Sequence, residues 1–307
     1  MSRRTEKETQ TRLNDVAAAE LVTALEAAGI PSILLKGPSI ARWLYAEGES
    51  RLYWDIDLLV SPRELPRAES LTARLGFQPL VSESTRIQRE SHHERWYRPV
   101  DNVCVELHRG FLGVEATDAQ LWDELIRNTE PLSLGGVVVQ VPDPAARTML
   151  VALHVAADGP KETPLEDLVR AIRQVPLETW QEAAALARRL RAEPALAVGL
   201  SLVPEGIDLA ARLGLAGTPS AEVILRSSTA TAMGFERLVR TRGLAGKLRY
   251  IATELAPPPA VLRQLDPLAR HGAAGIVVAY IVRPFRLASQ VPRGFLAWRS
   301  ARRRAAA

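Results

Sequence analysis

Two carboxylates in one apolar strand constrain the fold of this chain more than any other feature. The segment Asp55-Ile-Asp-Leu-Leu-Val60 has the apolar character of a buried strand. Side chains on a strand alternate between its two faces, so Asp55 and Asp57 point one way while the apolar residues point the other. Burying charged groups costs free energy unless they are solvated, paired or bound to cations. The fold must therefore provide such partners on that face of the strand.

A third acid is available on a later strand. In Asn102-Val-Cys-Val-Glu-Leu-His108 the apolar side chains share one face, which leaves Cys104, Glu106 and His108 on the other. If this strand pairs with the Asp55 strand, Glu106 joins the two aspartates. The sequence alone does not fix the register of that pairing. An Asp-x-Asp pair by itself also fits a solvated edge strand. The preceding glycine turn, the apolar character of the segment and the third acid favour a shared site.

Carboxylates grouped in this way are typical of a magnesium site. Mg²⁺ is a hard ion that usually takes one or two carboxylates together with substrate phosphates. Two-metal phosphoryl chemistry needs bridging carboxylates of this kind. The pattern therefore predicts a metal site at Asp55 and Asp57, with Glu106 as a third ligand if the two strands are neighbours.

The periodicity of the first 142 residues predicts an α+β domain with a small mixed β-sheet flanked by helices. Helical spacing of apolar residues alternates with short apolar runs that are typical of buried strands, and glycines mark the ends of helices. The predicted elements are helices over 14–29, 39–46 and 62–76, strands over 31–36, 55–60, 94–99 and 102–108, and a hairpin over 132–141.

From residue 142 onward the pattern is helical. Asp143 is a good N-cap, and Pro144 suits the first helical position. Further helices are expected over 164–174, 177–191 and 194–203, followed by more stretches rich in Ala, Leu and Arg. We therefore expect an α/β domain over 1–142 and an all-helical domain over 143–307.

Composition excludes several classes of protein. Apolar residues make up 47% of the 307 residues and charged residues 24%, which is ordinary for a soluble globular chain and excludes a disordered tail or a fibre. The formal net charge is only +4, which disfavours an RNA-binding module, and the basic run at 299–304 is interpreted as a solvated tail. The single cysteine, Cys104, cannot form an internal disulfide, so we expect a cytoplasmic protein.

No segment is predicted to span a membrane. The charged first sixteen residues are not followed by an apolar stretch, so they do not resemble a secretory signal. The most apolar run, over 272–282, has eleven residues, whereas a spanning helix needs roughly 20. We expect a buried helix there.

The acids and the turn before them resemble a known family. The likeness lies in Leu35-Lys-Gly-Pro-Ser-Ile-Ala-Arg-Trp-Leu-Tyr45 and in Arg51-Leu-Tyr-Trp-Asp-Ile-Asp-Leu-Leu-Val60. These segments resemble the uncharacterised bacterial nucleotidyltransferase family of the DNA polymerase β superfamily, in which a glycine-serine turn opens a helix, Asp-x-Asp lies on the next strand and a third carboxylate lies on a later one. Pro38 separates the glycine from the serine here, and the interval to the aspartates is longer than in many relatives. The likeness covers residues 15–110 and is weaker over 150–159 and 165–168.

The resemblance implies a Mg²⁺-dependent enzyme with a catalytic domain over 1–142 and a helical substrate-binding domain over 143–307. It would transfer a nucleoside monophosphate from a nucleoside triphosphate (NTP) to a hydroxyl or phosphate and release pyrophosphate. Asp55 and Asp57 would hold two Mg²⁺ ions, with Mn²⁺ as a possible replacement. Glu106 would hold the catalytic ion and help to deprotonate the acceptor.

The resemblance also implies phosphate contacts at the glycine turn. Backbone N–H groups around Gly37 and Ser39, at a helix N-terminus, would meet the β- and γ-phosphates, whereas Pro38 has no N–H to offer. Lys36 and Arg51 would neutralise charge on the leaving group. The alternative for Lys36 is a side chain that reaches solvent, and the alternative for Arg51 is a cap on the 47–50 loop.

The acceptor is left open. A small molecule, a ribosomally made peptide, a tRNA end and a protein side chain all fit the resemblance, and the oligomeric state is not predicted. His108 either lines the acceptor cleft or is a hydrogen-bonded neighbour of Glu106, and His154 is either a satisfied core histidine or part of that cleft. The alternatives to nucleotidyl transfer are kinase-like phosphoryl transfer through the same acids and a non-catalytic nucleotide-binding module.

Four other side chains receive structural interpretations. His92 and His93 are adjacent on a strand, so they point opposite ways and are not expected to chelate a metal together. Trp54 is interpreted as a core residue, with stacking on a base as the alternative. Asp167 is interpreted as an ordinary helix acid rather than a cleft residue.

Overall fold

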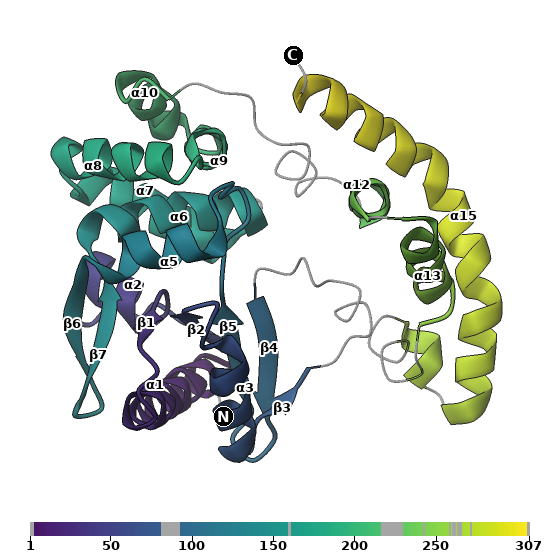
Figure 1. Cartoon of the computed structure of the whole chain (residues 1–307), viewed down its shortest axis with the longest axis horizontal. Helices are drawn as coiled ribbons and strands as arrows, with labels where there is room; N and C mark the ends of the chain where they lie inside the picture. The colour runs from purple at the N-terminus through teal and green to yellow at the C-terminus, as the bar shows by residue number, and fades with distance from the viewer. Residues whose placement is uncertain are drawn as a thin grey trace. The chain divides into compact units, whose positions relative to one another are not determined.

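The chain folds into two compact units in a computed structural model (Figure 1). The first unit comprises the described residues up to 215, and the second comprises those from 230 onward. The structure describes residues 3–80, 93–158, 161–215, 230–241, 243–257, 259, 262, 266–270 and 272–305.

A five-stranded mixed sheet forms the centre of the first unit, as predicted. Its strand order is β1-β2-β5-β4-β3, and β2 and β5 are parallel neighbours while the other pairs are antiparallel. The strand with the two aspartates is therefore not an edge strand. The strands are β1 (Ser32–Leu34), β2 (Asp55–Val60), β3 (Gln78–Pro79), β4 (His93–Arg98) and β5 (Val103–His108).

The apolar face of the central strands packs against helices, which leaves the opposite face to the acids. The predicted first helix begins earlier than expected: α1 runs from Arg3 to Ala27. Together with α3 (Leu65–Arg74) it covers the apolar side chains of β2 and β5 in one core cluster. Members of that cluster include Leu21 and Leu25 of α1, Leu58 of β2, Val105 and Leu107 of β5, and Ala68 of α3.

The predicted hairpin is also present. It consists of β6 (Thr129–Leu134) and β7 (Val137–Pro142), joined by Gly135 and Gly136, which both have positive φ. Only glycine adopts such a backbone without strain, so this pair sets the turn. The remaining helices beside the sheet are α2 (Pro38–Leu44) and α5 (Asp118–Ile126).

Five helices complete the first unit and group together in Figure 1. The predicted helix start is confirmed, because Asp143 Oδ1 accepts a hydrogen bond from Ala146 N at 2.7 Å. All five belong to the same compact unit as the sheet. They are α6 (Pro144–Asp158), α7 (Glu162–Gln174), α8 (Leu177–Arg189), α9 (Glu193–Ser201) and α10 (Pro204–Arg212). The boundary at 142 between a catalytic and a substrate-binding domain stays a prediction.

A close approach of α6 and α9 gives a test of this packing. A Cβ atom at Gly199 would lie 2.1 Å from the carbonyl oxygen of Ala152, so the helices must separate to admit a methyl group. We expect Gly199→Ala to lower the free energy of unfolding by about 2 kcal/mol, because overpacking costs more than the roughly 1 kcal/mol of helix propensity that alanine adds. Urea denaturation measures this loss. Ser201→Ala, at an exposed site of α9, is the control, and an equal loss in both variants would contradict the account.

The second unit contains α12 (Ala230–Arg240), α13 (Leu244–Leu255), the short 3₁₀ helix η1 (Pro267–Arg270) and α15 (Gly272–Ala305). The expectation of a buried helix over 272–282 is wrong. These residues are helical, but they begin the 34-residue α15, where Val277 is 57% exposed and Ile281 61%. Apolar composition predicted burial, yet the described helices of this unit cover only one side of α15. Among the residues that the structure describes, α15 is also the one helix that is long and apolar enough to cross a membrane, by length and composition alone.

Candidate active site

Parallel pairing of β2 and β5 brings the three predicted acids together. Asp57 lies directly opposite Glu106, and Asp55 lies opposite Cys104. Strand alternation places Asp55, Asp57 and Glu106 on the face that does not contribute to the apolar core. We call these three residues the acid cluster.

Asp57 is the buried centre of the acid cluster. It is 2% exposed, and its Oδ1 contacts Lys36 Nζ at 2.8 Å and His108 Nε2 at 2.9 Å. Burial alone would raise the pKa of Asp57, but the Lys36 ammonium and the hydrogen bond with His108 outweigh it and hold the pKa below the usual range. Lys36 lies just after β1. The preceding residue, Leu35, donates a backbone hydrogen bond to the Asp57 carbonyl at 2.9 Å, which places Lys36 beside β2. Asp57 is therefore charged and already neutralised by protein groups.

Asp55 has the opposite electrostatic character. Burial raises its pKa to about 6, and the charges of Asp57 and Glu106 add to that increase. Like charges that are brought together disfavour the ionised form. A divalent cation at this position would relieve the repulsion, so the acid cluster has an electrostatic reason to bind one.

His108 lies among the acids rather than at an open surface. It is 5% exposed, and its Nε2 is 3.4 Å from Glu106 Oε2 as well as 2.9 Å from Asp57. Its Nδ1 is buried and has no hydrogen-bond partner among the described residues. Of the two roles that the sequence left open, the structure gives His108 the contact with Glu106.

Strand β4 contributes Arg95, which the sequence analysis did not consider, and His93, which it considered only together with His92. The strand pairs antiparallel with β5, so Arg95 lies opposite Glu106 and His93 lies opposite His108. Arg95 Nε is 2.9 Å from Glu106 Oε1, and His93 Nε2 is 3.7 Å from Glu106 Oε2. Burial lowers the pKa of His93 to about 4. The sequence analysis rejected His92 and His93 as a chelating pair and so missed that His93 by itself faces the acids. His92 lies outside the described residues.

The glycine turn is shaped by Tyr53. Gly37 has a φ of 63°, and a Cβ there would meet the Tyr53 ring at 3.2 Å. Tyr53 donates a hydrogen bond to Asp15, and its carbonyl accepts one from Asn14 Nδ2 at 3.0 Å, so α1 holds the ring in place. Ser39, in the first turn of α2, has a buried hydroxyl without a hydrogen-bond partner in the described part of the chain.

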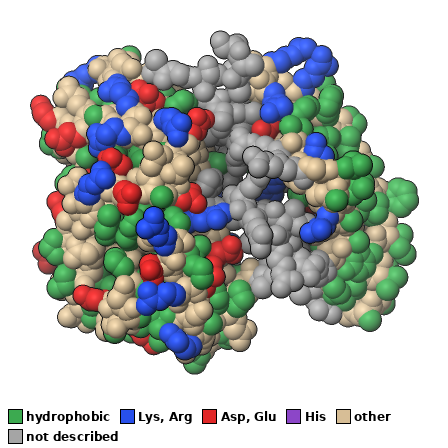
Figure 2. Space-filling model, viewed as in Figure 1, with side chains coloured by type: hydrophobic (Ala, Val, Ile, Leu, Met, Phe, Trp, Pro, Cys, Tyr) green, Lys and Arg blue, Asp and Glu red, His purple; other side chains and the backbone are tan. Residues whose placement is uncertain are grey.

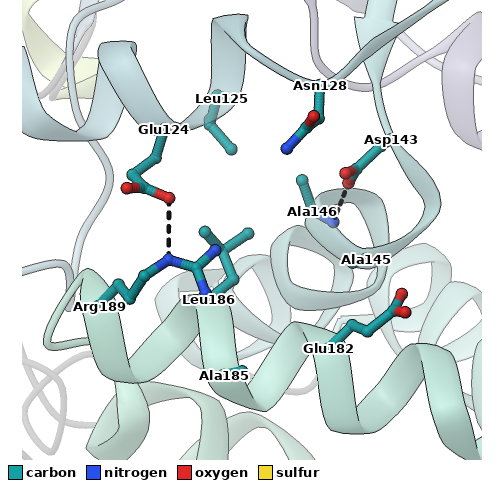
Figure 3. Close-up of a pocket in the computed structure, with 10 residues that line it drawn as sticks. All are labelled: Glu124, Leu125, Asn128, Asp143, Ala145, Ala146, Glu182, Ala185, Leu186 and Arg189. Atoms are coloured by element: carbon teal, nitrogen blue, oxygen red, sulfur yellow. Dashed lines mark hydrogen bonds and ion pairs between the residues drawn. The ribbon is translucent and has the colours of Figure 1, made fainter.

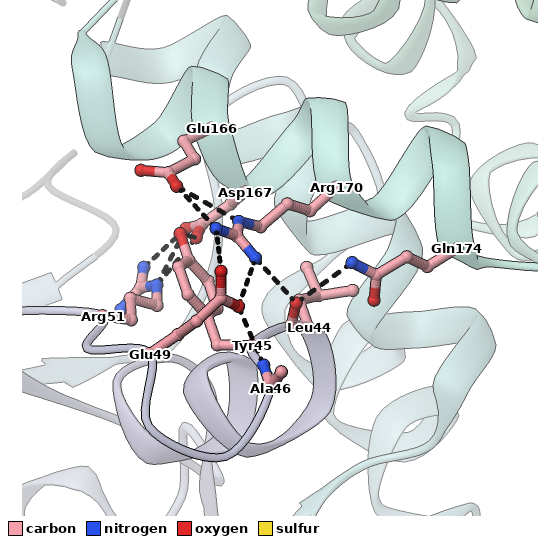
Figure 4. Close-up of polar contacts among 9 residues, drawn as sticks. All are labelled: Leu44, Tyr45, Ala46, Glu49, Arg51, Glu166, Asp167, Arg170 and Gln174. Carbon is pink, nitrogen blue, oxygen red and sulfur yellow. Dashed lines mark hydrogen bonds and ion pairs between the residues drawn. The ribbon is translucent and has the colours of Figure 1, made fainter.

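Arg51 is bound to Asp167 of α7 (Figure 4). Its Nε donates to Oδ1 at 2.8 Å and its Nη2 to Oδ2 at 2.6 Å, while Tyr45 Oη donates to Oδ1 at 2.9 Å. Both side chains of the ion pair are almost fully buried. Asp167 is therefore a buried partner of Arg51 and not the ordinary helix acid that the sequence suggested. The two guanidinium nitrogens of Arg51 that contact it are not directed at a phosphate.

A second set of contacts holds the same segment to α7. Arg170 Nη1 donates to Glu49 Oε2 at 2.7 Å, and Gln174 Nε2 donates to the Leu44 carbonyl at 3.2 Å (Figure 4). These bonds and the Arg51 pair bind residues 44–51, which lead into β2, to a helix more than a hundred positions later. The segment that leads into Asp55 is thus held in place by α7.

Two other residues that the sequence singled out differ in their exposure to solvent. His154 is half-buried on α6, and its place in an acceptor cleft stays a prediction. Trp54, directly before Asp55, is 53% exposed, so its interpretation as a core residue is wrong.

A pocket of about 370 Å³ lies between α5, α6 and α8 (Figure 3). None of the acid cluster lines it. Two of its acids already have partners, since Glu124 accepts from Arg189 and Asp143 caps α6. The pocket is therefore separate from the candidate site. Its lining residues are Glu124, Leu125, Asn128, Asp143, Ala145, Ala146, Glu182, Ala185, Leu186 and Arg189.

Residues 2–206 match a protein family described as an uncharacterised nucleotidyltransferase. The chain belongs to this family. The predicted resemblance and the predicted enzyme class, a transferase, are confirmed. The match covers the sheet, the acid cluster and helices α6 to α9. Helix α7, which supports residues 44–51, therefore belongs to the region that defines the family.

Solved structures are similar over part of the chain. The antibiotic-resistance factor ANT(2'')-Ia in solution is 14% identical, with a TM-score of 0.39 over 58% of this chain and 95% of its own. Its crystal structure in complex with adenylyl-2''-tobramycin gives 14% identity and a TM-score of 0.40, over 57% and 97%. An antigenic nucleotidyltransferase-like protein from Paracoccidioides brasiliensis is 16% identical, with a TM-score of 0.35 over 60% and 93%. No curated protein matches the chain.

Proposed function

We propose that this nucleotidyltransferase uses Mg²⁺ to move a nucleoside monophosphate from an NTP to a hydroxyl or phosphate of an acceptor, with release of pyrophosphate. The register that aligns Asp57 with Glu106 across two parallel strands, with Asp55 two residues earlier, carries this proposal. It joins three carboxylates on one face of a central strand pair, and charges that are buried together in this way cost free energy unless they are paired or bound to cations.

The acid cluster fits the proposed metal ions. Its donors are carboxylate oxygens, which Mg²⁺ prefers. The raised pKa of Asp55 reflects burial and crowding of like charges that bound cations would relieve. Asp55 and Asp57 would hold two Mg²⁺ ions, and Glu106 would hold one of them. The bound ions would neutralise charge on the phosphates and lower the pKa of the acceptor hydroxyl.

The protein's own groups would do the remaining work. Glu106, oriented by Arg95, would accept the proton of the acceptor hydroxyl. Lys36 holds Asp57 and is 20% exposed, so its ammonium can turn to the leaving pyrophosphate. The absence of a side chain at Gly37 lets the turn pack against the Tyr53 ring, and the buried hydroxyl of Ser39, which has no partner among the described residues, supports a phosphate contact at this turn.

Arg51 has a different proposed role from the one that the resemblance implied. It would hold the approach to β2 through Asp167 rather than bind phosphate. The acceptor is proposed to be a small molecule, a peptide, a tRNA or a protein that lies against the helical residues after 142, where His154 is a candidate contact.

Labelled nucleotides test the proposal and its main alternative. The full chain is incubated with Mg²⁺, a cell extract and each NTP, labelled in parallel experiments at the α- or the γ-phosphate. Nucleotidyl transfer puts only the α-label on the acceptor, whereas kinase-like transfer puts only the γ-label there. If the protein binds NTP and transfers neither label, it is a nucleotide-binding module and the proposal is wrong.

A further inference from the structure

Two histidine side chains lie beside Glu106 of the acid cluster. His93 on β4 and His108 on β5 are a directly opposed pair, and their ring centroids are 4.9 Å apart. Their Nε2 atoms lie 3.7 Å and 3.4 Å from the same oxygen, Oε2 of Glu106. His93 lies on β4, a strand that carries none of the proposed Mg²⁺ ligands, so those ligands do not account for it.

We propose that His93, Glu106 and His108 bind one divalent transition metal ion of the Zn²⁺ class. One possible ligand atom from each of these residues can be taken so that the three atoms lie within 4.8 Å of one another. Nitrogen and oxygen ligands lie about 2.0–2.1 Å from tetrahedral Zn²⁺ and hence about 3.3 Å from each other, close to the two contacts above. Imidazole nitrogen suits Zn²⁺, Fe²⁺ or Co²⁺ better than Mg²⁺, so this site differs in selectivity from the one made of carboxylates alone.

The inference deepens the proposed function, on which it rests for the role of Glu106. A transition metal at His93 and His108 would share Glu106 with the Mg²⁺ site. The transition metal ion would then lie beside the two Mg²⁺ ions proposed at Asp55 and Asp57, with Glu106 as the ligand that the two sites share.

Calorimetric titration of Zn²⁺ into the full chain tests the site. The wild-type protein is expected to bind one Zn²⁺ ion, and His93→Ala is expected to weaken that binding at least tenfold. The His93 side chain is 34% exposed, so its removal opens no core cavity, and His93→Gln is a second variant if the first does not fold. His154→Ala is the matched histidine control. With Co²⁺ as the probe, visible absorption of the bound ion should disappear in His93→Ala and persist in His154→Ala.

The results separate this inference from the proposed function. Equal Zn²⁺ affinity in the wild type and in folded His93 variants would overturn the metal site, whatever the transfer assay gives. Asp55→Asn should remove α-label transfer while Zn²⁺ binding that depends on His93 remains. A wild type that transfers no label but binds Zn²⁺ through His93 would refute the transfer reaction and leave the metal site in place.

A separate observation concerns α15, which exposes apolar side chains on a helix without acids. Val277, Ile281 and Phe285 are 57%, 61% and 74% exposed, and their spacing of four residues places them on one face. The helix contains seven arginines and no Asp or Glu. Three of the arginines pair with acids of neighbouring segments, namely Arg283 with Glu254, Arg286 with Asp266, and Arg302 with Glu236. Figure 2 shows hydrophobic atoms along the outer side of α15 and basic atoms near its C-terminal end.

We infer that this face of α15 binds the surface of an anionic membrane. An apolar face beside excess arginine is the chemistry of helices that lie in the membrane interface. The charge complements anionic headgroups, while the apolar side chains reach the acyl boundary. The run of apolar residues before Arg283 has eleven members and so spans about 16 Å, roughly half of a hydrocarbon core. The whole of α15 is long and apolar enough to cross a membrane by length and composition alone. Its exposed apolar face and its arginines instead favour a helix that lies on the membrane.

Vesicle flotation of the full chain tests this surface. Binding to vesicles that contain phosphatidylglycerol is expected to exceed binding to pure phosphatidylcholine at least tenfold, and Ile281→Asp with Phe285→Asp should abolish it. Val138→Asp, at a 58% exposed site of β7 in the other unit, is the matched control and should bind like the wild type. Absence of vesicle binding would overturn the inference. So would a dimer in solution that the double variant converts to monomers, because a second copy would then occupy the face.

Discussion

Replacing Asp57 by asparagine is expected to reduce α-label transfer at least about 10³-fold, which corresponds to about 4 kcal/mol of lost transition-state stabilisation. The carboxylate is 2% exposed and contacts both Lys36 and His108. Asparagine has nearly the same shape, so it preserves the strand, but it lacks the charge that a metal ion requires. The rate of transfer at saturating NTP and Mg²⁺ measures the loss.

Asp208→Asn is the control for this experiment. Asp208 is an exposed acid of α10, so its replacement removes the same charge without touching the acid cluster. Circular dichroism and thermal unfolding establish that Asp57→Asn is folded. A folded Asp57→Asn protein that keeps a tenth of the wild-type rate would contradict the assignment of Asp57 as a metal ligand.

The composition of the acid cluster could be predicted from the sequence because strand alternation is a local property. The two aspartates share a face whatever the fold, and so do Glu106 and His108. The partner strand is not a local property. Parallel pairing of β2 with β5 depends on long-range packing, so the sequence left open whether Glu106 would join Asp57. The same argument, applied to β4 once its pairing is known, brings in His93 and Arg95.

Burial was harder to predict than secondary structure. The helix over 272–282 was expected to be buried because it is apolar, but composition does not specify what covers a helix, and α15 exposes Ile281 and Phe285. Conversely, Asp167 was interpreted as an ordinary helix acid, but it is buried in an ion pair. Arg51, which pairs with it, lies 116 positions earlier. Pairs of this kind follow from tertiary structure alone.

The pair of Arg51 and Asp167 leads to the second large expected effect, on stability. Asp167→Asn should lower the free energy of unfolding by about 3–5 kcal/mol, because it leaves the Arg51 guanidinium buried without a counter-charge. The side chains are only 4% and 2% exposed, so water cannot replace the lost partner. Chemical denaturation of the variant measures the change.

An exposed ion pair and a double variant distinguish this effect from a general loss of charge. Arg173 Nη2 and Glu205 Oε1 are 3.2 Å apart with both side chains more than half exposed, so Glu205→Gln should have no measurable effect. Arg51→Met together with Asp167→Met should cost much less than the sum of the single substitutions, because two apolar side chains leave no unpaired charge in the interior. Additive losses in the double variant, or equal losses in Asp167→Asn and Glu205→Gln, would show that the buried charge pair does not hold residues 44–51 to α7.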